Sequence, residues 1–167
     1  MGGMTHVSDA RHVLYRDDSL NPDEAKRLTA DLLGQCDDGE LFLQYRASES
    51  FGFDDGRLKT ADYSSDAGFG LRGISGETTA FAHANELSAA AIRRAGETMQ
   101  LLDPTKTARQ PAPRRSNQQL YTDANPLSLI PFADKVALCQ KIDAAARARD
   151  PRVVQVSAGL TGSWSVV

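Results

Sequence analysis

The sequence has few of the residues and segments that mark membrane, secreted or disulfide-stabilised proteins. No apolar run approaches the roughly 20 residues that a membrane helix needs. The first four residues, MGGM, have neither the basic nor the apolar region of a signal peptide. The two cysteines, Cys36 and Cys139, form no CxxC pair, so we expect reduced, partly buried thiols rather than a disulfide or a sulfur metal site. These absences predict a cytoplasmic protein that contacts no membrane.

Strong charge of one sign is also lacking. The net charge of −3 gives no electrostatic reason for binding to nucleic acid. One basic stretch without acidic residues, from Pro104 to Thr122, contains Lys106, Arg109, Arg114 and Arg115. Basic side chains can contact phosphates, but no aromatic residues lie between these four and no recognition motif surrounds them. We therefore interpret the stretch as part of a solvated linker and disfavour a nucleic-acid partner.

Histidines are too few and too scattered for a metal site. The three histidines are His6, His12 and His83, and none is followed by glutamate. His6 and His12 are six residues apart, which places them on different faces of any helix. His83 is interpreted as a surface or capping residue at the end of a strand. The sequence thus predicts no catalytic residue and no metal ligand in this chain.

Residues 20–102 have the pattern of an α+β domain. Asn21 followed by Pro22 is a helix start, because asparagine caps helices and proline suits their first position; the helix should end at Gly34. The segment 41–83 is predicted to form several short strands, with a tight hairpin turn at Asp54-Asp55-Gly56. Asn85 should cap a second helix with apolar residues at near-helical spacing: Leu87, Ala91, Ala95, Met99 and Leu102. The order of elements predicts an antiparallel sheet flanked by helices.

Glycine alternates with larger residues from Gly68 to Gly73. Gly68 and Gly70 would leave one face of a strand bare, so that a backbone, a helix or a ligand can approach. Arg72 must then reach solvent or a partner: it lines a substrate passage or interface, or it pairs with a carboxylate such as Glu77 or Asp66. A phosphate-binding loop is disfavoured, because these glycines lie within a strand and not before a helix.

Three further segments complete the predicted layout. Residues 1–19 form a loose leader, and residues 103–127 form a linker with four prolines and no apolar period, where proteases should cut first. Residues 128–167 begin a second α+β domain. Its helix should run from Pro131 to Arg149 with an apolar face, and the strand after it should turn back at Thr161-Gly162. The apolar face is predicted to consist of Leu138, Ile142 and Ala145.

Two separated segments resemble one protein family. The first is Gly68 to Glu77 with Thr79 to Ala82 and Glu86 to Ser88; the second comprises Lys135 to Leu138, Asp143 to Arg147 and Asp150 to Ser157. In this order they resemble the N-terminal portion of the TldD/PmbA family, with the TldD branch more similar. The resemblance implies a zinc metalloprotease, once named for modulation of DNA gyrase, that processes or degrades peptides.

The family's catalytic zinc motif, His-Glu-x-x-x-His, corresponds to no position here. The resemblance therefore implies a non-catalytic N-terminal part of a longer, two-subunit protease, with zinc held elsewhere. Its partners would be the rest of its own polypeptide, a PmbA/TldE-like subunit or a second copy, and a peptide substrate. This part would shape the chamber and the subunit interface. Two alternatives stay open: a non-catalytic PmbA/TldE-type interaction module and a regulator associated with DNA gyrase.

Overall fold

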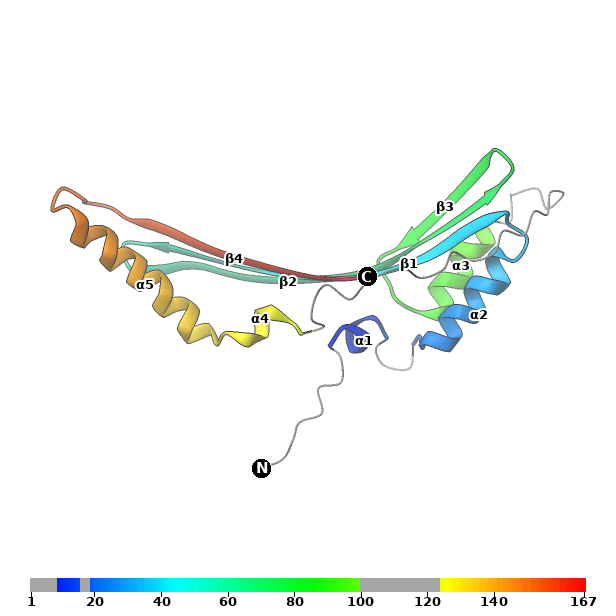
Figure 1. Ribbon diagram of the computed structural model, residues 1–167, viewed down its shortest axis with the longest axis horizontal. Helices are drawn as coiled ribbons and strands as arrows, with labels where there is room; N and C mark the ends of the chain where they lie inside the picture. Colours follow the sequence, from blue (N-terminus) through cyan, green and yellow to red (C-terminus); the bar gives the residue numbers. More distant parts are fainter. Residues whose placement is uncertain (1–8, 16–18, 100–123) are drawn as a thin grey trace, which may run out of the picture. The chain divides into compact units, whose positions relative to one another are not determined.

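The computed structural model describes residues 9–15, 19–99 and 124–167. They form two compact units, which we describe separately. Unit 1 comprises the described parts of residues 1–45, 66–124 and 166–167, and unit 2 comprises residues 46–65 and 125–165. The sheet order is β3-β2-β1-β4 (Figure 1). Its strands are β1 (Asp38–Asp54), β2 (Arg57–Ser75), β3 (Thr78–Ala84) and β4 (Ser157–Val166), and β1, β2 and β4 each contribute residues to both units.

The first helices of unit 1 follow the sequence closely. α1 (Asp9–Leu14) is a short turn that buries Val13 and Leu14, and α2 (Pro22–Leu33) begins at the predicted cap. The Asn21 side chain accepts a hydrogen bond of 2.8 Å from the Glu24 amide, which satisfies one of the amides left free at a helix start. The predicted helix from Asn21 to Gly34 is confirmed.

The other helix of unit 1, α3 (Ala89–Met99), packs beside α2 and against β3 (Figure 1). The predicted stripe is confirmed at Ala91, Ala95 and Met99, all of which are buried; Leu102 lies outside the described residues. The predicted cap is wrong. The Ser88 hydroxyl, and not Asn85, accepts the Ala91 amide at 3.1 Å, so the helix begins one turn later than expected.

The β1–β2 hairpin turns where the sequence predicts. Asp55 and Gly56 have φ angles of 50° and 68°, the left-handed conformation that two-residue hairpin turns use. The expectation of several short strands is wrong, because β1 has 17 residues and β2 has 19. Gly52, Gly68 and Gly70 lie within these strands, where neighbouring strands keep the backbone extended.

Unit 2 places one helix against the sheet. α4 (Pro126–Leu129) is a single turn and α5 (Phe132–Arg149) is long, which confirms the helix predicted from Pro131 to Arg149. Figure 1 shows α5 running alongside β4. The core beneath the helix contains Phe51, Phe53 and Cys139, with Val136, Ala158 and Leu160 packed around them.

Two predictions for unit 2 are wrong. Leu138 and Ile142 are 47% and 45% exposed, because Lys135 and Cys139 lie on the face that α5 turns to the sheet. The strand also does not turn back at Thr161-Gly162: β4 continues from Ser157 to Val166. A Cβ at Gly162 would lie 2.8 Å from Leu127 Cδ2, so this glycine permits a close approach rather than a turn.

The proposed leader and linker fall largely on residues that the structure does not describe, namely 1–8, 16–18 and 100–123. The domain ranges 20–102 and 128–167 and the basic stretch with Lys106, Arg109, Arg114 and Arg115 therefore stay predictions. Among the described helices, none combines the length and the apolar character needed to cross a membrane.

Candidate functional site

The described residues do not fit a zinc site. In the described ranges, no three side chains of the types His, Cys, Asp and Glu lie close enough together to hold a metal ion. His12 is exposed, and His83 is exposed and stacked on Phe81 with ring centroids 5.7 Å apart, which confirms His83 as a surface residue. His6 lies outside the described residues.

The two cysteines are free thiols in different environments. Cys139 is buried in the core of unit 2, whereas Cys36 is half-buried after α2. Burial raises the pKa of the Cys36 thiol, and the neighbouring carboxylate of Asp37 raises it further. A raised pKa lowers the thiolate fraction at neutral pH, so Cys36 is a poor nucleophile.

Arg72 lies on β2 opposite Phe81 of β3. Its Nε donates a hydrogen bond of 2.9 Å to Glu40 Oε1 on β1. The expectation of a carboxylate partner is thus met, but by Glu40 and not by the suggested Glu77 or Asp66. Glu40 is 32 residues away in sequence and becomes a neighbour only because β1 and β2 are adjacent strands of the sheet.

The two glycines of the candidate segment differ in what covers them. A Cβ on Gly68 would lie 2.6 Å from the backbone oxygen of Ala84, so another strand's backbone approaches it. A Cβ on Gly70 would lie 3.3 Å from the ring of Phe81, a side chain that is 64% exposed. The role of Gly68, Gly70 and Arg72 in a substrate passage or interface stays a prediction.

A buried ion pair connects α5 to β1 in unit 2. Lys135 Nζ lies 2.6 Å from Glu49 Oε1, and the two side chains are only 8% and 13% exposed. The same ammonium group donates to the backbone oxygen of Leu127 at 2.7 Å, and it lies 5.9 Å from the centre of the Phe51 ring. Removing two charges from water is costly, and these contacts offset the cost.

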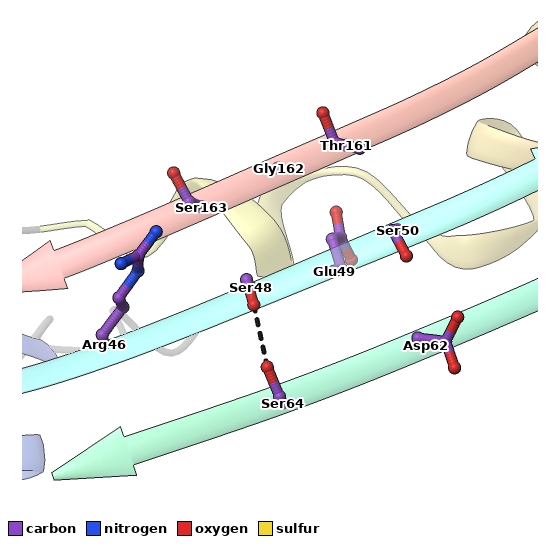
Figure 2. A pocket seen from close by; sticks show the side chains of 9 residues that line it. All are labelled: Arg46, Ser48, Glu49, Ser50, Asp62, Ser64, Thr161, Gly162 and Ser163. Carbon is purple, nitrogen blue, oxygen red and sulfur yellow. Dashed lines mark hydrogen bonds between the residues drawn. The ribbon is translucent and has the colours of Figure 1, made fainter.

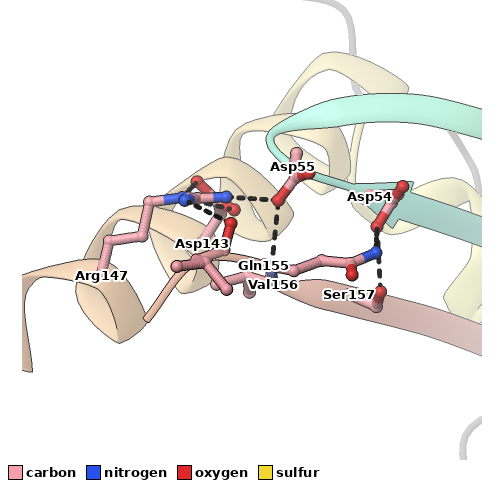
Figure 3. Close-up of polar contacts among 8 residues, drawn as sticks. Asp54, Asp55, Asp143, Arg147, Gln155, Val156 and Ser157 are labelled. Carbon is pink, nitrogen blue, oxygen red and sulfur yellow. Dashed lines mark hydrogen bonds and ion pairs between the residues drawn. The ribbon is translucent and has the colours of Figure 1, made fainter. Parts of the chain in front are cut away.

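A second polar cluster joins the β1–β2 turn to the segment before β4 (Figure 3). Arg147 of α5 pairs with Asp143 at 3.2 Å and also with Asp55 in the turn. Asp55 in turn accepts the Val156 amide at 3.2 Å, while its own amide donates to the Val156 oxygen at 2.9 Å. The contacts with Asp143 and Asp55 raise the pKa of Arg147, with Asp143 the main cause, so the guanidinium stays charged.

Asp54, next to the turn, is held by neutral donors. Its Oδ1 accepts hydrogen bonds of 3.0 Å from the Gln155 amide and 3.0 Å from the Ser157 hydroxyl. These two bonds lower the pKa of the Asp54 carboxyl, because they favour its charged form. Together with Arg147, they fix the hairpin tip to the chain that leads into β4.

The hollow of unit 2 is lined by polar side chains from three strands (Figure 2). Its volume is about 380 Å³ and it is open to solvent. β1, β2 and β4 contribute its lining: Arg46, Ser48, Glu49, Ser50, Asp62, Ser64, Thr161, Gly162 and Ser163. The Ser48 and Ser64 hydroxyls lie 2.9 Å apart and hydrogen-bond across β1 and β2. This site was not predicted from the sequence, although Arg46, Ser48 and Ser50 recur at the two-residue period of one strand face.

Comparison with known proteins agrees with the resemblance seen in the sequence. The model of PmbA/TldA metallopeptidase domain 1 matches residues 39–100, and that of the PmbA/TldA metallopeptidase central domain matches residues 125–167. A metalloprotease TldD homolog from Buchnera aphidicola subsp. Schizaphis graminum is 35% identical over 133 residues, which cover 78% of this chain and 28% of the relative. The homolog from Haemophilus influenzae is 31% identical over 135 residues, with coverage of 78% and 28%.

A solved structure supports the fold. The protein from Bacteroides thetaiotaomicron described as a modulator of DNA gyrase has a TM-score of 0.60 to this chain and 17% sequence identity; the match covers 90% of this chain and 36% of that one. At this identity the likeness concerns the fold alone, and it confirms the antiparallel sheet with flanking helices. The chain spans little more than a quarter of the length of the curated relatives it matches. Because both family domains match in order and together cover more than half of the sequence, the chain belongs to the PmbA/TldD metallopeptidase family.

Proposed function

We propose that this chain is the N-terminal, non-catalytic region of a TldD-like zinc metalloprotease subunit that processes or degrades peptides or unfolded proteins. The observation that carries the proposal is the ordered match to the first and central domains of a metallopeptidase family. It is supported by a set of described residues in which no group of three metal-ligand side chains converges. Zinc and the proton-transferring glutamate would belong to another part of the full protein.

In this proposal the chain has a structural role and contributes no catalytic residue. It forms part of the chamber and of the subunit interface, and its partners are the remainder of its polypeptide, a PmbA/TldE-like subunit or a second copy, and the peptide substrate. Two surfaces suit such a role. One is the exposed aromatic surface around Phe81 and His83 in unit 1, and the other is the polar hollow of unit 2.

The test measures metal and activity in the same preparation. The purified 167-residue chain is dialysed against buffer with a trace of zinc, its zinc content is determined, and peptide hydrolysis is measured at high protein concentration. We expect much less than one zinc per chain and no hydrolysis. Stoichiometric zinc with cleavage that a chelator abolishes would contradict the non-catalytic assignment.

A second measurement tests the interface. The chain is co-expressed with an affinity-tagged PmbA/TldE-like subunit, and the amount retained after washing is compared with that of an unrelated protein of similar size and charge. Specific retention, or formation of a homodimer in sedimentation, is expected. A chain that stays monomeric and is not retained would contradict the interface role.

A further inference from the structure

We infer that the hollow of unit 2 is a binding site for a short peptide with free termini, held in an extended conformation between Arg46 and Asp62. The hollow would suit any small molecule with one positive and one negative group, and the choice of a peptide among these rests on the proposed function. The charges, the hydroxyl groups and the shape of the hollow come from the structure itself.

The first step of the argument is the placement of charge. Arg46 and Asp62 lie at opposite ends of the labelled side chains in Figure 2. Within the described residues, neither side chain takes part in a hydrogen bond or ion pair. Other charged groups of unit 2, such as Lys135 and Arg147, have carboxylate partners. The hollow therefore offers one cationic and one anionic group that are both available to a ligand.

The second step concerns what lies between the charges. The middle of the hollow is lined by hydroxyl groups, from Ser48, Ser50, Thr161 and Ser163 among others. A hydroxyl both donates and accepts hydrogen bonds, so these groups match the alternating N–H and C=O of an extended peptide without selecting its side chains. A continuous apolar floor, which would favour a hydrophobic ligand, is absent from this lining.

The third step is the length of the ligand. Arg46 and Ser50 are four residues apart on β1, which corresponds to about 13 Å at the ~3.3 Å rise of a strand. An extended peptide of three or four residues spans the same distance. Its carboxylate would meet the guanidinium of Arg46, which suits two parallel hydrogen bonds, and its ammonium would meet Asp62. The volume of about 380 Å³ is within the range of small-ligand pockets, ~300–1,000 Å³.

The test uses tetra-alanine in four forms: with free termini, N-acetylated, C-amidated and blocked at both ends. Binding to the full chain is followed by amide chemical shifts in NMR titrations. Because the hollow is open, we expect weak binding of the free peptide, with a Kd on the order of 0.1–1 mM. Blocking either end should weaken binding about tenfold, and di-alanine should bind at least tenfold more weakly than tetra-alanine, since it cannot reach both charges.

Two variants test which terminus of the peptide is bound by Arg46 and which by Asp62. Arg46→Gln should weaken binding of the free peptide about tenfold and remove the effect of C-amidation, while the effect of acetylation persists. Asp62→Asn should also weaken binding of the free peptide about tenfold, but it should remove the effect of acetylation while the effect of C-amidation persists. Arg57→Gln, an exposed arginine on β2 outside the hollow, is the matched control and should change nothing. The same spectra show whether each variant is folded.

Three results would overturn the inference: no shifts at the lining residues, equal binding of free and doubly blocked peptides, or equal effects of Arg57→Gln and Arg46→Gln. None of these three results contradicts the proposed function, provided that the chain is free of zinc and binds its partner subunit. Conversely, zinc-dependent cleavage by the isolated chain would contradict the proposed function without removing a terminus-dependent peptide site.

Discussion

In unit 1 the helices α2 and α3 bury apolar residues, whereas in unit 2 the helix α5 is fixed to the sheet by charged groups. In unit 1, Leu20, Leu71 and Ile92 are almost fully buried. In unit 2, the ion pair of Lys135 and Glu49 lies inside, while Leu138 and Ile142 of the same helix face outward. Apolar burial is non-directional, so unit 1 tolerates small shifts; the polar contacts of unit 2 require defined positions. The comparison predicts where each unit is most sensitive.

The largest effect is expected for the buried ion pair. Lys135→Met leaves Glu49 without its cation in a site that is poorly accessible to water, and breaking such a pair costs about 3 kcal/mol or more of unfolding free energy. Urea unfolding followed by circular dichroism measures the loss. Lys141→Met, at an exposed position of the same helix, is the control and should cost less than about 0.5 kcal/mol.

The double variant Lys135→Met with Glu49→Leu tests whether the cost comes from the unpaired Glu49 carboxylate, because it removes both charges. It should be more stable than Lys135→Met alone, as apolar replacements of buried ion pairs often are. If Lys135→Met and Lys141→Met were equally stable, unit 2 would not depend on this pair, and its contrast with unit 1 would disappear.

The second prediction compares two glycines of unit 1. Gly68→Ala forces a Cβ to within 2.6 Å of the Ala84 backbone oxygen, which cannot move without disturbing the β2–β3 pairing, so we expect a loss of about 2 kcal/mol. Gly70→Ala meets only the exposed Phe81 ring at 3.3 Å, and a rotation of that ring relieves the contact; the loss should stay below about 1 kcal/mol. Equal melting temperatures for the two variants would show that the Gly68 contact is not tight.

A third, smaller effect is expected at the hairpin tip. Arg147→Met removes the guanidinium from Asp55 and Asp143, and because solvent screens the charges of a partly exposed arginine, the loss of unfolding free energy should be smaller than that of Gly68→Ala. Hydrogen exchange at the Val156 amide, which donates to Asp55, should become faster. Arg149→Met, two residues further on α5 and exposed, should leave that exchange rate unchanged; similar acceleration in both variants would argue against a specific role of Arg147.

The smallest effect concerns pH. The pKa of Asp54 is lowered below its ordinary value of 3.8 by Gln155 and Ser157, so its bonds stabilise the fold fully above about pH 4 and are lost as the pH falls through the lower, folded-state pKa. Gln155→Ala should raise the pKa of Asp54, as an NMR titration of the carboxyl carbon would show. An unchanged titration midpoint would mean that the Gln155 bond does not form in solution.

Local signals in the sequence were sufficient to predict much of the fold. The Asn21 cap, the Asp55-Gly56 turn and the helix ending at Arg149 depend on neighbouring residues, and the structure confirms all three. Apart from the cap of α3, where Ser88 and not Asn85 accepts the hydrogen bond, wrong predictions arose where partners are distant. Strand pairing kept β1, β2 and β4 extended through their glycines, and the charge of Lys135 was satisfied inside by Glu49, 86 residues away.

The candidate site shows the same limit. The partner of Arg72 and the set of residues that line the hollow depend on which strands are adjacent, and no short-range sequence pattern contains that information. Residues 46–50, 62–64 and 161–163 come together only once β4 has joined β1. The alternation of Arg46, Ser48 and Ser50 marks a polar strand face, but not what lies beside it.

The division of unit 2 into two stretches of sequence has a consequence for synthesis on the ribosome. Phe51 and Phe53 are translated long before Cys139, against which they pack. The interval is on the order of 85 residues, or roughly 4–17 s at ~5–20 residues per second. Throughout that time two aromatic side chains of the nascent hairpin await the helix that covers them. A translational pause between the two stretches would lengthen this exposure, so elongation speed over residues 54–138 should influence how much of the chain escapes aggregation.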